Sequence, residues 1–415
     1  MVKIKKVLAR EILDSHGYPT VEVEVILENG ASGWGAVPSG SSTGKYEAVE
    51  LRDGDENRYG GKGVLKAIEN VQKIIGPALI DLDSFDQIKI DQRMLELDGT
   101  SNKAKLGANA ILGVSIATLR AAAFSQKKPV WQYLKETTGS QACLPVPLMV
   151  VIEGGKHADK STDFQEFMVA PQGDFFRERL KKGTEIFHIL GRLLKENGHQ
   201  INVGLEGAYG PSLSSNQAAL ELILRAIQNS GYQAGRDVSL ALDPAASEFF
   251  QNGKYKLQKE NKTLDSSAMV EFWEDWIKKY PIFSLEDPLA EDDWEAWQKL
   301  TQKIGKQALV VGDDLTVTSL ERIKRAITEK ALNAVLIKMN QIGTITETLA
   351  AVKLCREHNL KCILSHRSGE TEDAFIADLC VGLGIEYCKF GGPDRGERTC
   401  KYNRLLRIEE KMGGE

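Results

Sequence analysis

Hydrophobic and polar residues alternate near the start of the chain and change to a helical spacing further on. Valines alternate with glutamates over residues 21–27, and Glu-Asn-Gly follows at 28–30. Such alternation is typical of a strand with one buried face, and the turn residues predict a hairpin with the next short apolar stretch. Apolar residues recur at helical spacing over 64–75 and over the Ala- and Leu-rich segment 104–124, which predicts a mostly buried helix. We therefore expect residues 1–125 to form a small α+β domain.

From residue 144 onward, short apolar runs are separated by amphipathic stretches of helical length. Six of these runs end in an ionisable side chain: Asp243, Glu286, Asp313, Lys338, His366 and Lys389. Four of the five intervals between them match the length of one βα unit, which predicts a parallel sheet. Residues 144–415 suit an eight-stranded TIM-type βα barrel, typically about 250 residues long. The predicted fold class is α/β, a C-terminal barrel joined by a linker at 126–143 to the smaller N-terminal domain.

The composition fits a globular protein of this size. The 415 residues are 42% hydrophobic and 27% charged, with a formal net charge of -5. This length exceeds the roughly 250–300 residues that one hydrophobic core supports, and the acidic balance argues against a dedicated nucleic-acid-binding protein. The six cysteines lack zinc-binding spacing, and no segment has the pattern of an export signal or a membrane span. We therefore expect a reduced, cytoplasmic protein that is not associated with a membrane.

The six ionisable residues would meet at one mouth if they end different strands of one barrel, where TIM-type barrels carry their active sites. A single charged residue after a strand is more often a helix cap or a solvated loop residue, so the inference depends on all six together. The carboxylates of Asp243, Glu286 and Asp313 are hard oxygen ligands, which favour Mg²⁺ over zinc. Lys338 and Lys389 would lie near this cation and near each other, which lowers the pKa of a lysine and lets it act as a base. The set predicts proton abstraction beside a carboxylate, with the metal stabilising the enolate.

Nine ordered segments of the chain carry a family resemblance. They are VPSGSSTGKYEAVELRDGD, GANAILGVSIA, DFQEFMVAP, ALDPAASEF, SLEDPLAEDDWEAW, VGDDLTVT, IKMNQIGT, SHRSGETED and KYNRLLRIEE. Through them the chain resembles the enolase family over essentially its whole length. The resemblance implies a glycolytic lyase that reversibly dehydrates 2-phosphoglycerate, a small phosphorylated acid, to phosphoenolpyruvate. It also implies a cytoplasmic homo-oligomer, a dimer in the family.

The resemblance assigns the metal ligands and the base. Asp243, Glu286 and Asp313 would hold a first Mg²⁺. Ser42, in the SGSSTG loop that is expected to close as a mobile lid, would meet a second ion that arrives with the substrate. Lys338 would remove the C2 proton of the substrate.

The resemblance also assigns the acid and the substrate-binding residues. Glu206 would assist departure of the C3 hydroxyl, supported by Glu166 and His157, and Lys389 would help to bind the substrate carboxylate. An arginine fork suits phosphoryl oxygens, so a phosphoryl pocket is expected around the segment 366–368. Its implied residues are Arg367 and Ser368, which would hold the phosphoryl group, with His366 and Gln165 beside them.

The chain departs from the enolase pattern at several positions. The enolase pattern has Asn at position 153, Asp at 205, Gly at 208, Thr at 390 and Ser at 396. This chain has Glu153, Leu205, Ala208, Phe390 and Gly396 there. The pattern also has Arg at position 16 and Asn at 18, where this chain has His16 and Tyr18. Loss of a carboxylate at Leu205 is expected to alter the orientation of the neighbouring Glu206. A methyl at Ala208 would be strained if the backbone there needed a positive φ, and Phe390 is far bulkier than threonine.

These departures leave three hypotheses open. The leading one is a working, divergent enolase, because all the residues assigned above are present. The second is an enolase-superfamily enzyme that acts on another carboxylate substrate, if Leu205 and Phe390 reshape the pocket. The third is a non-catalytic enolase-like protein with a binding or structural role.

Overall fold

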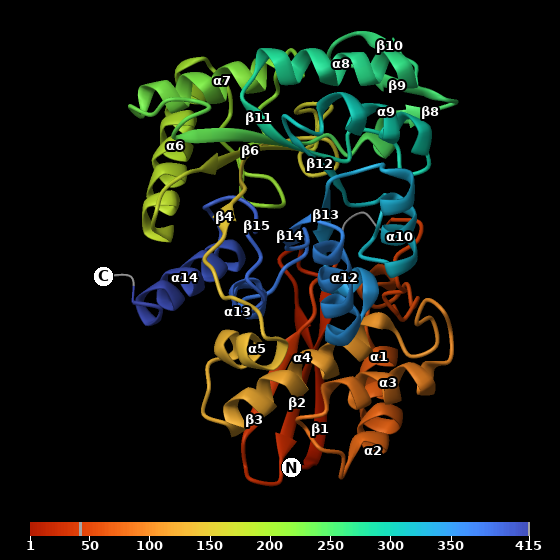
Figure 1. The fold of residues 1–415 in the computed structure, drawn as a ribbon. Coiled ribbons are helices and arrows are strands. Elements are labelled where there is room, and N and C mark those ends of the chain that lie inside the picture. The colour runs from red at the N-terminus through yellow and green to blue at the C-terminus, as the bar shows by residue number, and fades with distance from the viewer. Residues whose placement is uncertain (41–43, 414–415) are drawn as a thin grey trace.

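The structure is a computed structural model that describes residues 1–40 and 44–413, with a small N-terminal domain below a larger barrel in Figure 1. The N-terminal sheet is antiparallel, in the order β1-β2-β3: β1 (Ile4–Leu13), β2 (Pro19–Leu27) and β3 (Ser32–Ala36). The predicted hairpin, formed by β2 and β3, is confirmed. The sequence did not predict β1, because only Ile4 and Val7 of its ten residues are buried and the alternation is weak.

Helices complete the N-terminal domain. They are α1 (Leu65–Asn70), α2 (Gly76–Leu79), α3 (Gln87–Asp98) and α4 (Ala108–Ser125), with a 3₁₀ turn η1 (Tyr59–Gly61) and a π turn η2 (Val71–Ile75). Both predicted helices are confirmed, the first as α1 continued by η2 and the second as α4. Helix α4 packs closely on β2 through Gly113, where a Cβ atom would lie 2.7 Å from the side chain of Val23.

Helix α4 is the one described helix that is long and apolar enough, by length and composition, to cross a membrane. Its 18 residues have a mean hydropathy of 1.3, and 89% of them are buried inside the protein. Because the helix fills the core between the N-terminal sheet and its neighbours, packing inside the protein accounts for its apolar character.

The barrel is a nine-stranded sheet in the order β4-β15-β14-β13-β12-β11-β7-β6-β5. Its strands are β4 (Val146–Pro147), β5 (Met149–Glu153), β6 (Glu166–Pro171), β7 (Val238–Asp243), β11 (Ile282–Glu286), β12 (Leu309–Gly312), β13 (Ala334–Ile337), β14 (Lys361–Ser365) and β15 (Tyr387–Lys389). Strands β4 and β5 are consecutive in the chain but lie at opposite ends of this order, so the sheet curls into a nearly closed barrel. The predicted TIM-type barrel is confirmed.

One strand of the barrel runs against the parallel arrangement that the sequence predicted. β6 pairs antiparallel with both β5 and β7, whereas the other neighbouring strands pair in parallel. Because β6 is reversed, its first residue, Glu166, pairs with Asp243 at the end of β7 and with Glu153 at the end of β5. The start of β6 and the ends of the other strands therefore meet at the same mouth.

Helices surround the barrel (Figure 1). They are α6 (Phe176–Glu196), α7 (Asn216–Asn229), α8 (Ser266–Lys279), α9 (Trp294–Ile304), α10 (Leu320–Glu329), α11 (Met339–Ile342), α12 (Ile345–Glu357), α13 (Phe375–Leu383) and α14 (Gly396–Lys411). After β7 come a 3₁₀ turn η3 (Ala246–Phe249) and a small antiparallel sheet of β8 (Phe250–Gln251), β9 (Lys254–Leu257) and β10 (Lys262–Leu264). Helix α5 (Val130–Thr138) lies within the segment 126–143 and packs on α13.

Side chains fill the barrel interior, so the functional pocket lies at its mouth. The interior residues come from alternate positions of the strands, as the pleat requires. They are Leu148, Val150, Met168, Ala170, Ala208, Ala241, Val311, Ala334, Leu336 and Ile363.

The two domains are joined beside that mouth. Ser39 pairs through its backbone with Gly369, which follows β14. Farther out, the buried guanidinium of Arg120 on α4 forms an ion pair with Asp373 at 2.5 Å. These contacts hold the segment before residue 41 against the barrel.

Candidate active site

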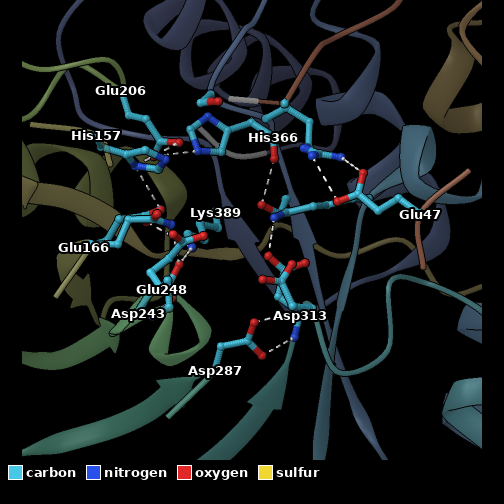
Figure 2. Close-up of a pocket in the computed structure, with 18 residues that line it drawn as sticks. Glu47, His157, Glu166, Glu206, Asp243, Glu248, Asp287, Asp313, His366 and Lys389 are labelled. Carbon is cyan, nitrogen blue, oxygen red and sulfur yellow. Dashed lines mark hydrogen bonds and ion pairs between the residues drawn. The ribbon is translucent and has the colours of Figure 1, made fainter. Parts of the chain in front are cut away.

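The predicted strand-end residues come together in one buried pocket at the mouth of the barrel (Figure 2). Three of them are the last residues of β7, β11 and β15, and three directly follow β12, β13 and β14. Five of the six line the pocket. The sixth, Glu286, reaches it through a contact with Lys389.

Lys389 is the centre of one cluster of buried charges. Its Nζ atom lies 2.9 Å from Asp243 Oδ2 and 2.7 Å from Glu286 Oε1. It also lies 3.0 Å from Oε2 of Glu166, at the start of β6. One ammonium group therefore balances three carboxylates that burial would otherwise disfavour.

Lys338 and Asp313 form a second ion pair beside the first. The ammonium group of Lys338 donates a short hydrogen bond to Asp313 Oδ2. The other oxygen of Asp313 accepts a hydrogen bond from Gln341 Nε2 at 2.9 Å. We call Asp243, Glu286, Asp313, Lys338 and Lys389 together the lysine half of the site.

The pKa directions of the two lysines follow from the carboxylates beside them. Burial lowers the pKa of Lys338, but the carboxylate of Asp313 outweighs it and raises the pKa above its ordinary value. Burial is likewise outweighed at Lys389, mainly by Asp243, and its pKa is raised well above the ordinary value. The lowered pKa values expected from the sequence refer to lysines beside a bound cation, so that expectation stays a prediction. In the structure, each ammonium group instead lies against carboxylates.

The acidic residues of the lysine half are compatible with a bound metal ion. Burial, together with Asp243, raises the pKa of Glu286 well above its ordinary value. Burial opposes ionisation of Asp313 as well, but Lys338 outweighs it and holds the pKa of Asp313 below its ordinary value. Carboxylates gathered this closely need a positive partner, and the lysines supply it here. Carboxylate oxygens are the preferred ligands of a hard divalent cation, so these residues have the chemistry to hold one. The residues whose ligand atoms lie within 4.8 Å of one another are His157, Glu166 and Glu206 in one group, and Asp287, Asp313 and Asp314 in another.

Three neighbouring aspartates form a second acidic group, in which one side chain binds the backbone. Single oxygens of Asp287, Asp313 and Asp314 lie within 4.8 Å of one another. However, both oxygens of Asp287 accept backbone N–H groups, from Asp313 at 2.9 Å and from Asp314 at 2.8 Å. Asp287 therefore orients the end of β12, and with it the carboxylate of Asp313.

Two imidazoles and two carboxylates face one another on the other side of the pocket (Figure 2). His157 Nδ1 lies 3.5 Å from Glu206 Oε1 and 3.7 Å from Glu166 Oε1, and His366 Nε2 lies 3.2 Å from Glu206 Oε2. None of these contacts is aligned as a hydrogen bond between the described residues. We call His157, Glu166, Glu206 and His366 together the acid half of the site.

The protonation of His366 follows from its other ring nitrogen. Arg398 Nη1, which can only donate, lies 2.8 Å from His366 Nδ1, so Nδ1 accepts. Burial lowers the pKa of His366 to about 3. The ring is therefore neutral and carries its hydrogen on Nε2, the atom that faces Glu206.

The pKa values of the two glutamates of the acid half are shifted in opposite directions. Burial and the nearby Glu206 raise the pKa of Glu166 well above its ordinary value. Burial also opposes ionisation of Glu206, but the facing His157 and His366 outweigh it and hold the pKa of Glu206 well below its ordinary value. These opposite directions fit two side chains that share one proton, and the role of acid that the resemblance gives to Glu206 stays a prediction. Paired groups with separated pKa values are typical of acid–base sites.

The residues assigned to the phosphoryl group lie beside the lysine half. Arg367, Ser368 and Gln165 all line the pocket. Arg367 Nη1 donates to Glu47 Oε2 at 2.9 Å and to Asn340 Oδ1 at 3.0 Å. Ser42, the remaining assigned residue, lies outside the described residues, as do its two neighbours in the predicted lid, residues 41 and 43.

The departures from the enolase pattern lie outside the pocket wall. Phe390 is fully buried and packs beside Tyr402 of α14, at a ring-centroid distance of 6.3 Å. Ala208 does not have a positive φ, so the predicted strain is absent, and its methyl group packs in the barrel interior. Leu205 lines an outer cavity with His16 and Tyr18, and this cavity adjoins the pocket, because Gly40 and Glu47 line both. Of these residues, none is among the described side chains that line the pocket.

Reasoning from the sequence missed several residues of the site. Glu47, Glu248, Asp287 and Asp314 line the pocket, and Arg398 orients His366. Asp287 and Asp314 each follow a residue that was singled out, so a pair of acids after a strand was an available signal. No local pattern identifies Glu47, because it reaches the pocket from the other domain.

Two family models match the chain and together span nearly all of it. Residues 4–134 match the model described as "Enolase, N-terminal domain", and residues 141–415 match the one described as "Enolase, C-terminal TIM barrel domain". Both matches agree with the nearly closed barrel and the small N-terminal sheet. Acidic clusters compatible with metal binding lie where the barrel strands end. The chain therefore belongs to the enolase family.

Proposed function

We propose that the protein is a working enolase that reversibly dehydrates 2-phosphoglycerate to phosphoenolpyruvate. The observation that carries this proposal is the pairing of the two halves: a lysine half and an acid half face each other across one buried pocket. Removal of a proton from C2 and of a hydroxyl from C3 needs a base and an acid on opposite sides of the substrate. The acid half and the lysine half supply these two groups.

In the proposed reaction, Lys338 accepts the C2 proton on Nζ. A divalent cation, which we propose to be Mg²⁺ held by Asp243, Glu286 and Asp313, would stabilise the negative charge that develops on the substrate carboxylate. Lys338 loses the interaction that raises its pKa when Asp313 is engaged elsewhere, and the neutral amine can then act as the base. Lys389 binds the substrate carboxylate beside these residues.

The acid half completes the dehydration. Glu166 and Glu206 share a proton near His157, and this proton leaves with the C3 hydroxyl as water while the C3–O bond breaks. Arg367 and Ser368 bind the phosphoryl group, which places C2 towards Lys338 and C3 towards Glu206. The ion pair between Arg367 and Glu47 lets the N-terminal domain help to position the arginine.

Finer assignments belong to the same proposal. A second Mg²⁺ would arrive with the substrate and meet Ser42, and the enzyme would act in glycolysis as a cytoplasmic homodimer. The alternative of another carboxylate substrate rested on Leu205 and Phe390, and neither side chain lines the pocket. No contact of the described residues favours the non-catalytic alternative over an active site.

A substrate comparison tests the proposal. The purified protein is incubated with 2-phosphoglycerate, or with glycerate, which lacks the phosphoryl group, in Mg²⁺ or in excess chelator. We expect ultraviolet absorbance from phosphoenolpyruvate only with the phosphorylated substrate and Mg²⁺. Equal turnover of glycerate would contradict the substrate assignment, and no turnover of either acid would contradict the proposed activity.

A further inference from the structure

Glu153 is a buried carboxylate whose hydrogen bonds all go to the segment that carries Glu206. It is the last residue of β5 and is 0% exposed. Its Oε1 atom accepts a hydrogen bond from the N–H group of Ala208 at 2.9 Å, and its Oε2 atom accepts one from the N–H group of Glu206 at 3.1 Å. The side chain thus contacts the backbone on both sides of Gly207.

The segment 204–208 has no helix or strand of its own, so its shape depends on such contacts. The N–H group of Gly204 donates to the carbonyl oxygen of Ala208 at 2.9 Å and closes the turn. The carbonyl oxygen of Glu206 accepts from the N–H group of Gly392 at 2.8 Å. Glu153 is the side chain that accepts the N–H group of Glu206 itself. Without it, two buried N–H groups would lose their acceptors, which is costly.

The turn wraps closely around the carboxylate of Glu153. A Cβ atom built on Gly204 would lie only 2.5 Å from Glu153 Cδ, so the glycine allows the backbone to pack over the carboxylate. Gly207 has a φ of +78°, and a Cβ atom there would lie 2.6 Å from the carbonyl oxygen of Asp394. The segment is therefore confined between Glu153 and the loop after β15, and small shifts of Glu153 would move Glu206.

Two departures from the enolase pattern together leave a carboxylate beside this segment. The pattern has Asp at position 205 and Asn at 153, whereas this chain has Leu205 and Glu153. Leu205 lines the outer cavity with His16 and Tyr18 and is not among the described residues that line the pocket. Glu153 is buried on the pocket side of the turn, against the backbone of Glu206. The chain thus keeps one acidic side chain next to the segment 204–208, and this side chain, that of Glu153, binds the backbone of the segment.

We propose that Glu153 is a positioning residue for Glu206: its carboxyl group holds the turn at 204–208 so that the side chain of Glu206 faces His157 and His366. This inference rests on the proposed role of Glu206, but it concerns where that side chain lies and not the reaction itself. Glu153 does not touch the pocket, so it acts on the reaction only through Glu206.

Two substitutions at Glu153 separate a positioning role from a merely structural one. Glu153→Ala removes both acceptors, whereas Glu153→Gln keeps an amide oxygen at the Oε1 position, from which it can reach both N–H groups. The matched control is Asp91→Ala. Asp91 is also 0% exposed and accepts a backbone N–H group, that of Thr346 at 2.9 Å, but it lies outside the pocket.

Steady-state kinetics with 2-phosphoglycerate give the first readout. We expect Glu153→Ala to lower kcat about 10- to 100-fold with KM changed less than about threefold, because a misplaced acid affects the transition state more than substrate binding. Glu153→Gln should recover most of this loss. Asp91→Ala should lower thermal stability while it leaves the kcat of the folded protein unchanged.

Hydrogen exchange gives a second readout that does not need activity. The N–H groups of Glu206 and Ala208 should exchange at least about tenfold faster in Glu153→Ala than in the wild type, and near the wild-type rate in Glu153→Gln. A wild type without dehydratase activity would contradict the proposed function, and this exchange pattern would still test the positioning role. Unchanged exchange at both groups in a folded Glu153→Ala, or a kcat equal to that of the wild type, would overturn the inference.

Discussion

The lysine half and the acid half of the site differ in how their charges are balanced. In the lysine half, the carboxylates of Asp243, Glu286 and Asp313 each accept a hydrogen bond from an ammonium group. In the acid half, Glu166 Oε2 lies 3.0 Å from Lys389 Nζ, but His157 Nδ1, His366 Nε2 and Glu206 Oε2 make no aligned hydrogen bond among the described residues. Buried polar groups normally have partners. The difference indicates that the acid half is arranged to receive a hydroxyl or a water.

The halves also differ in their surroundings. The residues of the lysine half sit at the ends of strands, whose positions are fixed by the sheet. In the acid half, Glu206 and His157 lie on loops, and Glu206 depends on Glu153 for its place. Glu153, Leu205 and Ala208 are departures from the enolase pattern that lie on or against that loop, whereas Phe390 directly follows Lys389 at the end of β15. Three of the departures therefore lie where the position of a loop depends on its contacts.

The largest effect should come from removing the base. Lys338→Ala deletes the proton acceptor and leaves Asp313 without its ammonium partner, so kcat should fall by about 10⁴-fold. Coupled assays of phosphoenolpyruvate formation measure this directly. The control is Lys353→Ala, an exposed lysine whose side chain is 78% accessible. Activity in Lys338→Ala within tenfold of the wild type would disprove the assignment of the base.

Loss of a ligand should separate metal binding from acid chemistry. Glu286→Gln removes a charged oxygen from the lysine half, so Mg²⁺ affinity measured by calorimetry should fall about 10- to 100-fold. Glu206→Gln, in the acid half, should bind Mg²⁺ as tightly as the wild type. Equal losses of affinity in both variants would show that the two halves do not act separately.

Much of this comparison could be predicted from the sequence, and the rest required three-dimensional contacts. Charged residues at the ends of apolar runs identified the strand ends, because parallel strands of one barrel bring their carboxyl ends together. The reversal of β6 could not be read from its short apolar run, so only the resemblance identified Glu166. Glu47 could not be predicted either, since its partner Arg367 is far away in sequence. The direction in which the pKa of Lys338 shifts depends on which charged group lies nearest. The spacing of residues along the sequence does not reveal this.

The pH dependence of stability should sharpen the comparison on the acid side. Burial and the nearby Glu206 raise the pKa of Glu153 from 4.5 to about 8. Between these values the folded protein binds a proton that the unfolded chain releases, so stability falls as pH rises, by at most about 1.4 kcal/mol per pH unit. Glu153→Gln lacks this loss. The free energy of unfolding of the variant relative to the wild type, measured by urea unfolding, should therefore be larger at about pH 8 than at about pH 5.5.

The control for this measurement is Glu357→Gln, on a side chain that is 57% accessible in an exposed ion pair. Its stability relative to the wild type should be nearly the same at both pH values. If Glu153→Gln shows no gain between the two, the carboxyl of Glu153 does not hold a proton in the folded protein.

The smallest effect should come from restoring the pattern at position 205. Leu205→Asp places a carboxylate in the outer cavity that His16 and Tyr18 also line. Because Glu153 already holds the turn, kcat/KM should change by less than about threefold. A larger gain would show that the acid half is impaired by Leu205, and a larger loss would show that this cavity communicates with the pocket.

The account's central claim is that the two halves perform separate steps, proton removal and hydroxyl departure. Exchange of the C2 hydrogen of 2-phosphoglycerate with deuterated water, followed by NMR, tests this claim most directly. Glu206→Gln should still exchange the C2 hydrogen while forming almost no phosphoenolpyruvate, and Lys338→Ala should do neither. Exchange in Lys338→Ala, or its loss in Glu206→Gln with Mg²⁺ still bound, would contradict the division of the site into two halves.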